Sequence, residues 1–373
     1  MKLVDVCKIQ YGYAFDSSQF SNAGGLPLVR IRDVVRGYSE TFTTEQCESQ
    51  YYVSNGDLLI GMDGEFNISM WRGGSALLNQ RVCKLIPSDQ VSKLFLYYFM
   101  PVALKHIEDK TPFVTVKHLS AKQLNLVELP KFSLDEQKNI AEKFEKVDSL
   151  ITARREQLAK LDELVKSRFI ELFGDPVVNE KGWDTKPLLE MGSCKNGMNF
   201  HYEDAGVEIN CLGVGDFKDY SIIADTSMLP TVSLNEMPSV EYMLQDDDIV
   251  FVRSNGNKAL VGRSVAVYPG DVPTTFSGFC IRYRKTDEAV NIPYLLRVLK
   301  SESVRQKMVG RGANIQNLNQ QILGTLIIPV PPIELQNQFA AFVEQTDKSK
   351  FVVQESLEKL ETLKKALMQK YFG

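Results

Sequence analysis

Residues 130–174, PKFSLDEQKNIAEKFEKVDSLITARREQLAKLDELVKSRFIELFG, recur in altered form as residues 329–373, PVPPIELQNQFAAFVEQTDKSKFVVQESLEKLETLKKALMQKYFG. The two stretches align without a gap at a constant separation of 199 positions, so that Pro130 matches Pro329. Identical residues also stand at Gln137/Gln336, Ala141/Ala340, Glu145/Glu344, Asp148/Asp347, Glu156/Glu355, Leu158/Leu357, Lys160/Lys359, Leu161/Leu360, Leu164/Leu363, Phe173/Phe372 and Gly174/Gly373. A repeat at so long an interval is an internal duplication rather than a solenoid of short repeats.

Both copies have the pattern of a long helix. Ser133 and Glu136 form a capping box, in which each side chain accepts a hydrogen bond from the backbone of the first turn. Gly174 can take the left-handed conformation that ends a helix, and Pro176 prevents its continuation. In the second copy Pro332 suits the first helical turn. A helix of about 38 residues is expected to be ~57 Å long at ~1.5 Å per residue.

Apolar residues in both helices recur at alternating spacings of four and three, the pattern of a coiled-coil seam. The first seam consists of Ile140, Phe144, Val147, Ile151, Arg154, Leu158, Leu161, Val165, Arg168 and Leu172. The second consists of Phe339, Val343, Thr346, Lys350, Val353, Leu357, Leu360, Lys364, Leu367 and Tyr371. Arg154 and Arg168 match apolar residues of the other copy, which favours pairing between the copies. The alternative is an ordinary amphipathic helix on a core. A two-fold axis would make the helices antiparallel, with the flanking domains at opposite ends.

Length and composition indicate a globular protein of two or three domains. Of the 373 residues, 44% are hydrophobic and 24% charged, and no apolar run approaches the ~20 residues of a membrane span. Met1-Lys2-Leu3 does not begin a secretory signal, so we expect a cytoplasmic protein that does not bind membranes. The six cysteines form no C-x-x-C pair, which argues against a zinc site or a disulfide framework and favours isolated buried thiols.

Charge is balanced along the chain. The formal net charge is -4, and residues 1–129 contain 13 basic and 13 acidic side chains. No segment has the basic excess of a general nucleic-acid-binding protein. Binding to DNA would therefore depend on local clusters of polar side chains.

Residues 1–129 and 176–328 are looser copies of each other, sharing Gly12/Gly197, Asp33/Asp216 and Asp57/Asp248. Short β-rich runs are expected at 27–31, 58–61 and 81–86, and at 208–212, 249–253 and 279–284. One helical stretch follows in each, at 91–107 and 293–309. We therefore expect an α+β fold with two similar domains, each with a curved, mostly antiparallel sheet. These domains, 1–129 and 176–328, are joined by an antiparallel coiled coil of a central spacer helix (130–175) and a C-terminal spacer helix (329–373).

The two domains carry different polar residues at matching places. In the first domain, Arg30 and Arg32 are expected on one face of a strand end by period-two alternation, where the second domain has glycines. The segments that follow the helical stretches, 111–120 and 310–319, are polar in both domains. The candidate DNA-binding residues are Arg30, Arg32, Arg36, Asn67, Lys117, His118, Arg253, Ser254, Asn255, Lys258, Arg311, Asn314, Gln316 and Asn317. Arginine matches guanine, and asparagine and glutamine match adenine, in the major groove. Solvated surface strands and a loop leading into the next strand are the alternatives.

The sequence predicts no catalytic, metal-binding or cofactor-binding residue. Three consecutive acids, Asp246 to Asp248, point in different directions and are expected to form a turn before a strand rather than a cation site. There is no phosphate loop, and Gly213-Val214-Gly215 lacks the third glycine of a dinucleotide fingerprint. The three histidines have no nucleophile motif beside them.

Over its whole length the chain resembles the specificity subunit of type I restriction-modification systems. The resemblance is carried by the segments 129–137 and 328–336, the Phe-Gly helix ends, and the Gly12/Gly197 and Asp57/Asp248 segments. It implies that 1–129 and 176–328 are target recognition domains, each reading one half of a bipartite, asymmetric site on double-stranded DNA. The second copy departs from the first where Pro332 replaces Ser133 and Leu335 replaces Glu136, so the capping box of the first helix is not repeated.

The resemblance also implies partners. The helices would set the unread spacing and dock two methyltransferase (modification) subunits, which carry S-adenosylmethionine, and the assembly would recruit a restriction subunit. This chain would itself not be an enzyme. A free-standing DNA-binding or coiled-coil adaptor protein and an enzyme with an unrecognised site are the alternatives.

Overall fold

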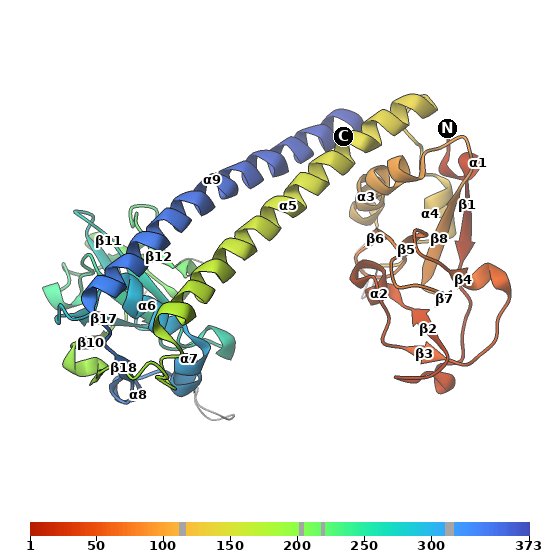
Figure 1. The fold of residues 1–373 in the computed structure, drawn as a ribbon. Coiled ribbons are helices and arrows are strands. Elements are labelled where there is room, and N and C mark those ends of the chain that lie inside the picture. The colour runs from red at the N-terminus through yellow and green to blue at the C-terminus, as the bar shows by residue number, and fades with distance from the viewer. Residues whose placement is uncertain (112–116, 201–204, 218–220, 310–316) are drawn as a thin grey trace. The chain divides into compact units, whose positions relative to one another are not determined.

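A computed structural model describes the chain except for residues 112–116, 201–204, 218–220 and 310–316 and the side chain of Lys258 (Figure 1). The chain divides into two compact units. Unit 1 comprises residues 1–156 and 354–373, and unit 2 comprises residues 157–353. The two longest helices, α5 (Leu134–Phe173) and α9 (Ile333–Phe372), each contribute one part to unit 1 and the other to unit 2.

Unit 1 contains two four-stranded sheets. The first has the order β1-β8-β5-β6 and is antiparallel throughout. Its strands are β1 (Cys7–Tyr11), β8 (Val82–Pro87), β5 (Leu58–Gly61) and β6 (Asn67–Met70). The second sheet contains β3 (Phe42–Thr43), β2 (Leu26–Val29), β7 (Ala76–Leu78) and β4 (Tyr52–Val53) in that order, with β2 and β7 parallel. The helices before α5 are α1 (Leu3–Val6), α2 (Ile31–Arg36), α3 (Lys93–Lys110) and α4 (Ala121–Asn125).

Unit 2 contains a five-stranded sheet of order β10-β17-β14-β15-β12 and a three-stranded sheet of order β13-β11-β16. The strands of the larger sheet are β10 (Gly192–Asn196), β17 (Cys280–Lys285), β14 (Asp248–Val252), β15 (Ser264–Val267) and β12 (Ile222–Ile223). The smaller sheet has β13 (Thr231–Leu234), β11 (Val207–Leu212) and β16 (Thr274–Phe276), and β18 (Ile327–Pro329) pairs separately with β9 (Thr185–Pro187). The helices are α6 (Ile292–Lys300), α7 (Glu302–Val309) and α8 (Gln320–Gly324). Single 3₁₀ turns are η1 (Ser17–Gln19), η2 (Ser49–Tyr51), η3 (Leu188–Glu190), η4 (Val214–Asp216), η5 (Val240–Tyr242) and η6 (Lys258–Leu260).

The predicted fold class is confirmed, and the strands of each domain lie mainly in two sheets. Among the described strands the pairing is mostly antiparallel, with β2–β7, β11–β16 and β12–β15 parallel. The two domains also share close backbone contacts. A Cβ on Gly12 would lie 2.0 Å from the carbonyl oxygen of Asn79, and one on Gly197 would lie 2.1 Å from that of Ser277. Glycine is therefore required at this shared position, because the backbone of Asn79 or Ser277 passes too close to leave room for a side chain.

The three-aspartate run forms a turn before β14, as predicted. Asp247 has φ of +70°, and Asp248 accepts a hydrogen bond from the backbone N–H of Gln245 at 2.8 Å. Its counterpart Asp57 accepts from Ser54 N at 2.9 Å in the turn before β5. The Asp248 carboxylate is fully buried and binds the Arg284 guanidinium at 2.7 Å.

The helix ends follow the sequence signals. Ser133 N donates to Glu136 Oε2 at 2.8 Å and Glu136 N donates to Ser133 Oγ at 3.3 Å, which confirms the capping box. Gly174 ends α5 with φ of +75°. Every residue of the two predicted seams is buried or half-buried, which confirms the coiled-coil pattern.

Within each unit α5 and α9 run antiparallel. In unit 1, Lys143 binds the Tyr371 hydroxyl at 3.1 Å and Asp148 binds Lys364 at 2.6 Å. Residues later in α5 therefore contact residues earlier in α9. In unit 2, Asp162 binds Lys350 at 2.6 Å.

Two secondary-structure predictions need correction. Residues 30–33 were expected to end a strand, but β2 stops at Val29 and α2 begins at Ile31. The reason is Asp33, which accepts a hydrogen bond from Arg30 N at 2.9 Å and so caps the first turn. The stretch 293–309 is two helices, separated at Ser301, rather than one.

Candidate nucleic-acid interface

In unit 1 the end of β5 meets the segment before α4. Leu119 N donates to Met62 O at 2.7 Å, and Asp63 and His118 form an antiparallel bridge. The structure therefore brings His118 and Leu119, at the end of the polar segment 111–120, into contact with residues 62 and 63, which are far away in the sequence.

The Asp63 carboxylate organises the side chains around this bridge. Its Oδ1 lies 2.5 Å from His118 Nδ1, and its Oδ2 lies 3.5 Å from Arg81 Nε. The side chain of Asp63 is 16% exposed, whereas those of His118 and Arg81 are 59% and 55% exposed. A largely buried carboxylate therefore holds two exposed donors at one strand end.

Lys117 and Asn67 are turned toward the protein. Lys117 Nζ donates to the Glu108 carbonyl at 2.8 Å, which ties this loop to α3. Asn67 Nδ2 donates to Glu65 O at 3.1 Å, and its buried Oδ1 has no hydrogen-bond partner in the described part of the chain. These contacts indicate that both side chains stabilise loops in the structure as it stands.

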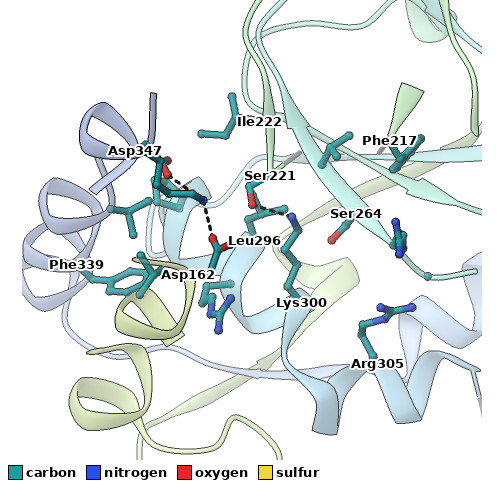
Figure 2. Close-up of a pocket in the computed structure, with 18 residues that line it drawn as sticks. Asp162, Phe217, Ser221, Ile222, Ser264, Leu296, Lys300, Arg305, Phe339 and Asp347 are labelled. Carbon is teal, nitrogen blue, oxygen red and sulfur yellow. Dashed lines mark hydrogen bonds and ion pairs between the residues drawn. The ribbon is translucent and has the colours of Figure 1, made fainter. Parts of the chain in front are cut away.

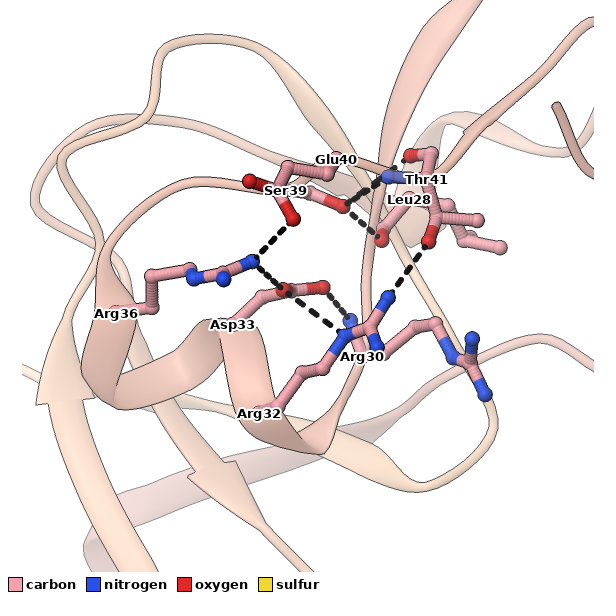
Figure 3. Close-up of polar contacts among 8 residues, drawn as sticks. All are labelled: Leu28, Arg30, Arg32, Asp33, Arg36, Ser39, Glu40 and Thr41. Atoms are coloured by element: carbon pink, nitrogen blue, oxygen red, sulfur yellow. Dashed lines mark hydrogen bonds and ion pairs between the residues drawn. The ribbon is translucent and has the colours of Figure 1, made fainter. Parts of the chain in front are cut away.

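Arg32 and Arg36 lie beside one buried acid on α2, Asp33, to which Arg30 donates through its backbone N–H (Figure 3). Asp33 is fully buried, and its Oδ1 lies 3.8 Å from Arg32 Nε and 3.9 Å from Arg36 Nη1. Arg36 also binds Glu40 at 2.8 Å, and its guanidinium lies 4.7 Å from the centre of the Tyr38 ring. Arg32 and Arg36 therefore follow helical spacing, and Arg30 is the exposed N-cap residue. The expectation that Arg30 and Arg32 share a strand face is wrong because Asp33 nucleates a helix there.

Unit 2 repeats the unit 1 pairing with different residues. Leu318 N donates to Arg253 O at 2.8 Å, and Ser254 and Asn317 form an antiparallel bridge. These positions correspond to Met62, Asp63, His118 and Leu119 of unit 1. The backbone arrangement is thus the same, while an Asp–His pair is replaced by a Ser–Asn pair.

Other predicted residues of unit 2 fall into two groups. Arg253 Nη1 donates to Gly278 O at 3.2 Å. Asn255 Oδ1 accepts from Asn257 N at 2.8 Å, so the asparagine side chain closes a turn. Lys258 lies in η6, but its side chain is outside the described atoms. Arg311, Asn314 and Gln316 lie outside the described residues.

The sequence reasoning missed three residues at these strand ends. They are Asp63, Arg81 and Phe279; Phe279 is 62% exposed and its carbonyl accepts from Arg253 N at 2.8 Å. Arg81 and Phe279 immediately precede the matching strands β8 and β17, so the alignment of the two domains contained a signal for them.

In the described residues no group of three or more histidine, cysteine, aspartate or glutamate side chains could hold a metal ion. No helix in the same portion of the chain is both long enough and apolar enough to cross a membrane. All six cysteines are free thiols, and burial raises the pKa of Cys83 to about 12.

Residues 1–163 and 181–362 match the family described as type I restriction modification DNA specificity domain. The specificity subunit of the type I restriction enzyme EcoBI of Escherichia coli is 29% identical over 98% of this chain and 84% of its own length. That of MjaVIII from Methanocaldococcus jannaschii is 22% identical over 92% of this chain and 88% of its own.

Two solved structures have a similar fold. The crystal structure of the type I restriction-modification S subunit from M. genitalium has a TM-score of 0.61 at 15% identity, covering 100% of this chain and 95% of that chain. A second, from work on complex assembly and conformational transition of the type I system, has a TM-score of 0.60 at 16% identity, covering 100% and 96%. Because the family match spans both domains and most of both long helices, this chain belongs to the type I restriction-modification DNA specificity family.

Proposed function

We propose that each unit of this chain reads one half of a bipartite, asymmetric sequence on double-stranded DNA. The observation that carries the proposal is the backbone pairing that recurs with different side chains, Asp63–His118 in unit 1 and Ser254–Asn317 in unit 2. Reading two unlike half-sites requires a constant scaffold that presents different donors and acceptors to base edges. Asn317 and His118 are exposed at these pairings, as base contact requires.

The pair of long helices is suited to setting the distance between half-sites. Modules that read adjacent turns of one DNA face are separated by ~34–36 Å. Each 40-residue helix is ~60 Å long at ~1.5 Å per residue, which is more than this separation. Ion pairs such as Asp148–Lys364 and Asp162–Lys350 would keep α5 and α9 in one register, and so keep the unread spacer constant.

The helices also offer two equivalent surfaces for methyltransferase subunits. Leu164 on α5 and Leu363 on α9 are the same residue of the repeat, and they are 49% and 46% exposed. Apolar side chains at matching exposed places of a duplicated helix fit two copies of one partner. These partners would carry S-adenosylmethionine and perform methylation, a restriction subunit would perform cleavage, and this chain would be non-catalytic. Partner subunits would also supply phosphate contacts that a chain of net charge -4 lacks.

Co-expression with methyltransferase subunits from the same genome tests the proposal. The chain should co-purify with them, and sequencing of methylated host DNA should yield two half-sites at a fixed spacing. Co-purification without any methyltransferase would favour a free-standing adaptor. Methylation or cleavage of DNA by the isolated chain would establish an enzyme and refute the proposal.

A further inference from the structure

Unit 2 contains a cavity of about 470 Å³ that is bounded by α5, α6, α7, α9 and the start of β15 (Figure 2). This volume lies in the ~300–1,000 Å³ range of small-ligand pockets. The described ionisable residues that line it are Arg263, Arg297, Lys300, Arg305 and Lys350, with Asp162 and Asp347. Cationic groups therefore outnumber carboxylates.

Lys350 contacts both carboxylates, and Asp162 also acts on the charges of Arg297 and Lys300. Lys350 Nζ lies 2.6 Å from Asp162 Oδ1 and 3.7 Å from Asp347 Oδ1. Burial lowers the pKa of Lys300 to about 8, with further lowering by Arg297, Lys350 and Arg263. Burial likewise lowers the pKa of Arg297. An anion in the cavity would stabilise these charges.

Two serine hydroxyls add neutral hydrogen-bonding groups. Lys300 Nζ donates to Ser221 Oγ at 2.9 Å, which directs the ammonium toward the cavity wall shown in Figure 2. Ser264 is 2% exposed, and its buried Oγ has no hydrogen-bond partner in the part of the chain that the structure describes. Leaving a buried hydroxyl without a partner is unfavourable, so a ligand that accepts a hydrogen bond from Ser264 would be stabilised.

The duplicated domain provides an internal comparison. Ser92 and Asn291 are matching N-cap residues, each bonded through its backbone N–H to the matching glutamines Gln137 and Gln336. From these N-caps onward the sequence of α3 aligns without a gap with that of α6 and α7. The pair Ile151/Lys350 comes from the repeat that forms α5 and α9. The matching positions are Tyr98/Arg297, Pro101/Lys300, His106/Arg305 and Ile151/Lys350.

Unit 1 has a cavity at this place, lined by His106, Asp148 and Ile151 among others. Its basic side chains, Arg72, Arg155, Lys364 and Lys365, stand at other positions than the four compared here. The acid is retained, since Asp148 matches Asp347. The second copy thus differs by introducing a basic side chain at each of the four positions. A role in packing alone would not require this change, because the same helices pack in unit 1 with tyrosine, proline, histidine and isoleucine.

We propose that the cavity of unit 2 binds a phosphate-bearing ligand. Guanidinium groups match phosphate oxygens in bidentate geometry, and a lysine adds a point charge. Phe217, Leu296 and Phe339 form an apolar wall that would accept the organic part of a nucleotide. The phosphate could belong to a free nucleotide or to the backbone of bound DNA.

The cavity is connected to the candidate interface by a direct contact. Arg305 Nη2 donates to Ala259 O and to Val261 O, both at 3.1 Å. These carbonyls belong to the segment that follows the turn at Asn255 and leads to Arg263 on the cavity wall. A ligand bound to Arg305 would therefore contact the residue that holds this segment in place.

Calorimetric titration of the full chain with pyrophosphate and with ADP, without DNA, tests the proposal. Saturable binding is expected, and Arg297→Gln and Lys300→Met should each weaken it by about tenfold or more, because each removes a charge-assisted hydrogen bond. His106→Ala, at the matching place in unit 1, is the control and should not change the affinity. Circular dichroism would show whether Arg297→Gln or Lys300→Met fails to fold. The other variant then still tests the proposal.

A second experiment with duplex DNA distinguishes the two sources of phosphate. If DNA supplies it, duplex DNA will compete with pyrophosphate and Arg297→Gln will reduce the salt dependence of DNA affinity. If a free nucleotide supplies it, DNA and ADP will bind together. The proposal fails if the wild-type chain binds neither compound and Arg297→Gln binds DNA as His106→Ala does. Because the titration contains no DNA, its failure leaves the proposed half-site reading intact.

Discussion

Gln137 and Gln336 make the same hydrogen bonds in their respective units. Gln137 Oε1 accepts from Ser92 N at 3.0 Å and its Nε2 donates to Phe132 O at 3.1 Å. Gln336 Oε1 accepts from Asn291 N at 2.9 Å and its Nε2 donates to Pro331 O at 2.8 Å. Both side chains are almost fully buried. Each glutamine therefore joins the first turn of a long helix to the helix of the neighbouring domain.

Replacing this glutamine should destabilise the chain. Gln336→Leu keeps the side-chain volume but leaves the Asn291 N–H buried without its acceptor, which costs about 1–3 kcal/mol. Chemical denaturation measures the loss. Gln338→Leu, at an exposed position on the same helix, is the matched control and should change stability by no more than about 0.5 kcal/mol. Equal effects of the two changes would show that the buried bonds do not stabilise the junction.

Removing the carboxylate of Asp63 should impair recognition of one half-site only. Asp63→Ala frees His118 and Arg81 from the group that orients them, and a lost base contact costs about 1–3 kcal/mol of discrimination. Competition binding with duplexes altered in one half-site at a time measures the effect. Ser254→Ala in unit 2 should act on the other half. A uniform loss across all duplexes would instead assign Asp63 a role in folding or phosphate binding.

The exposed leucines of the repeat should contribute to partner binding. Leu164→Glu and Leu363→Glu place a charge in each proposed docking surface, and the double variant should lose association with methyltransferase subunits because buried unpaired charges are costly. Single variants should each remove one of two copies. Native mass spectrometry of the complex reports the stoichiometry. Retention of both copies by the double variant would place the docking surface elsewhere.

Ligand binding in the unit 2 cavity should depend on pH through Lys300. Among the residues that the structure describes, the charged groups lining the cavity with Lys300 are Arg263, Arg297, Arg305, Asp162, Asp347 and Lys350. With a pKa lowered to about 8, Lys300 is mostly charged below this pH and mostly neutral above it. Affinity for a dinucleotide, whose phosphodiester charge is constant, should therefore fall as the pH rises through about 8.

Lys300→Arg provides the control for this pH dependence. Arginine stays charged up to pH ~12, so binding by this variant should remain nearly constant across the same range. An identical pH profile for the wild type and Lys300→Arg would assign the titration to another group.

Local signals in the sequence predicted the elements whose causes are local. The Ser133 capping box, the C-terminal Gly174 and the spacing of the seam residues determine the two long helices, and β5 was predicted with its observed bounds. The strand end predicted at residues 30–33 from period-two alternation is wrong, because the cap from Asp33 and the left-handed Gly37 favour a helix. The division into two sheets depends on which strands meet in space, and periodicity does not contain that information.

The candidate interface shows the same limit. His118 could be selected as a polar residue in a loop, but its partner Asp63 is 55 positions away. Burial of Lys117 against Glu108 is likewise a tertiary contact. The cavity in unit 2 required the structure to show that Arg297, Lys300 and Lys350 face one space, although the alignment of the two copies already contained the substitutions.

Exchange of one domain tests the central claim most directly. Residues 1–129 would be replaced by the corresponding domain of a related specificity subunit, and methylated positions in the host genome would be mapped with the methyltransferase subunits present. If each unit reads its own half-site, one half of the methylated sequence will change while the other half and the spacing stay the same. A change in both halves, or no change in either, would contradict the account.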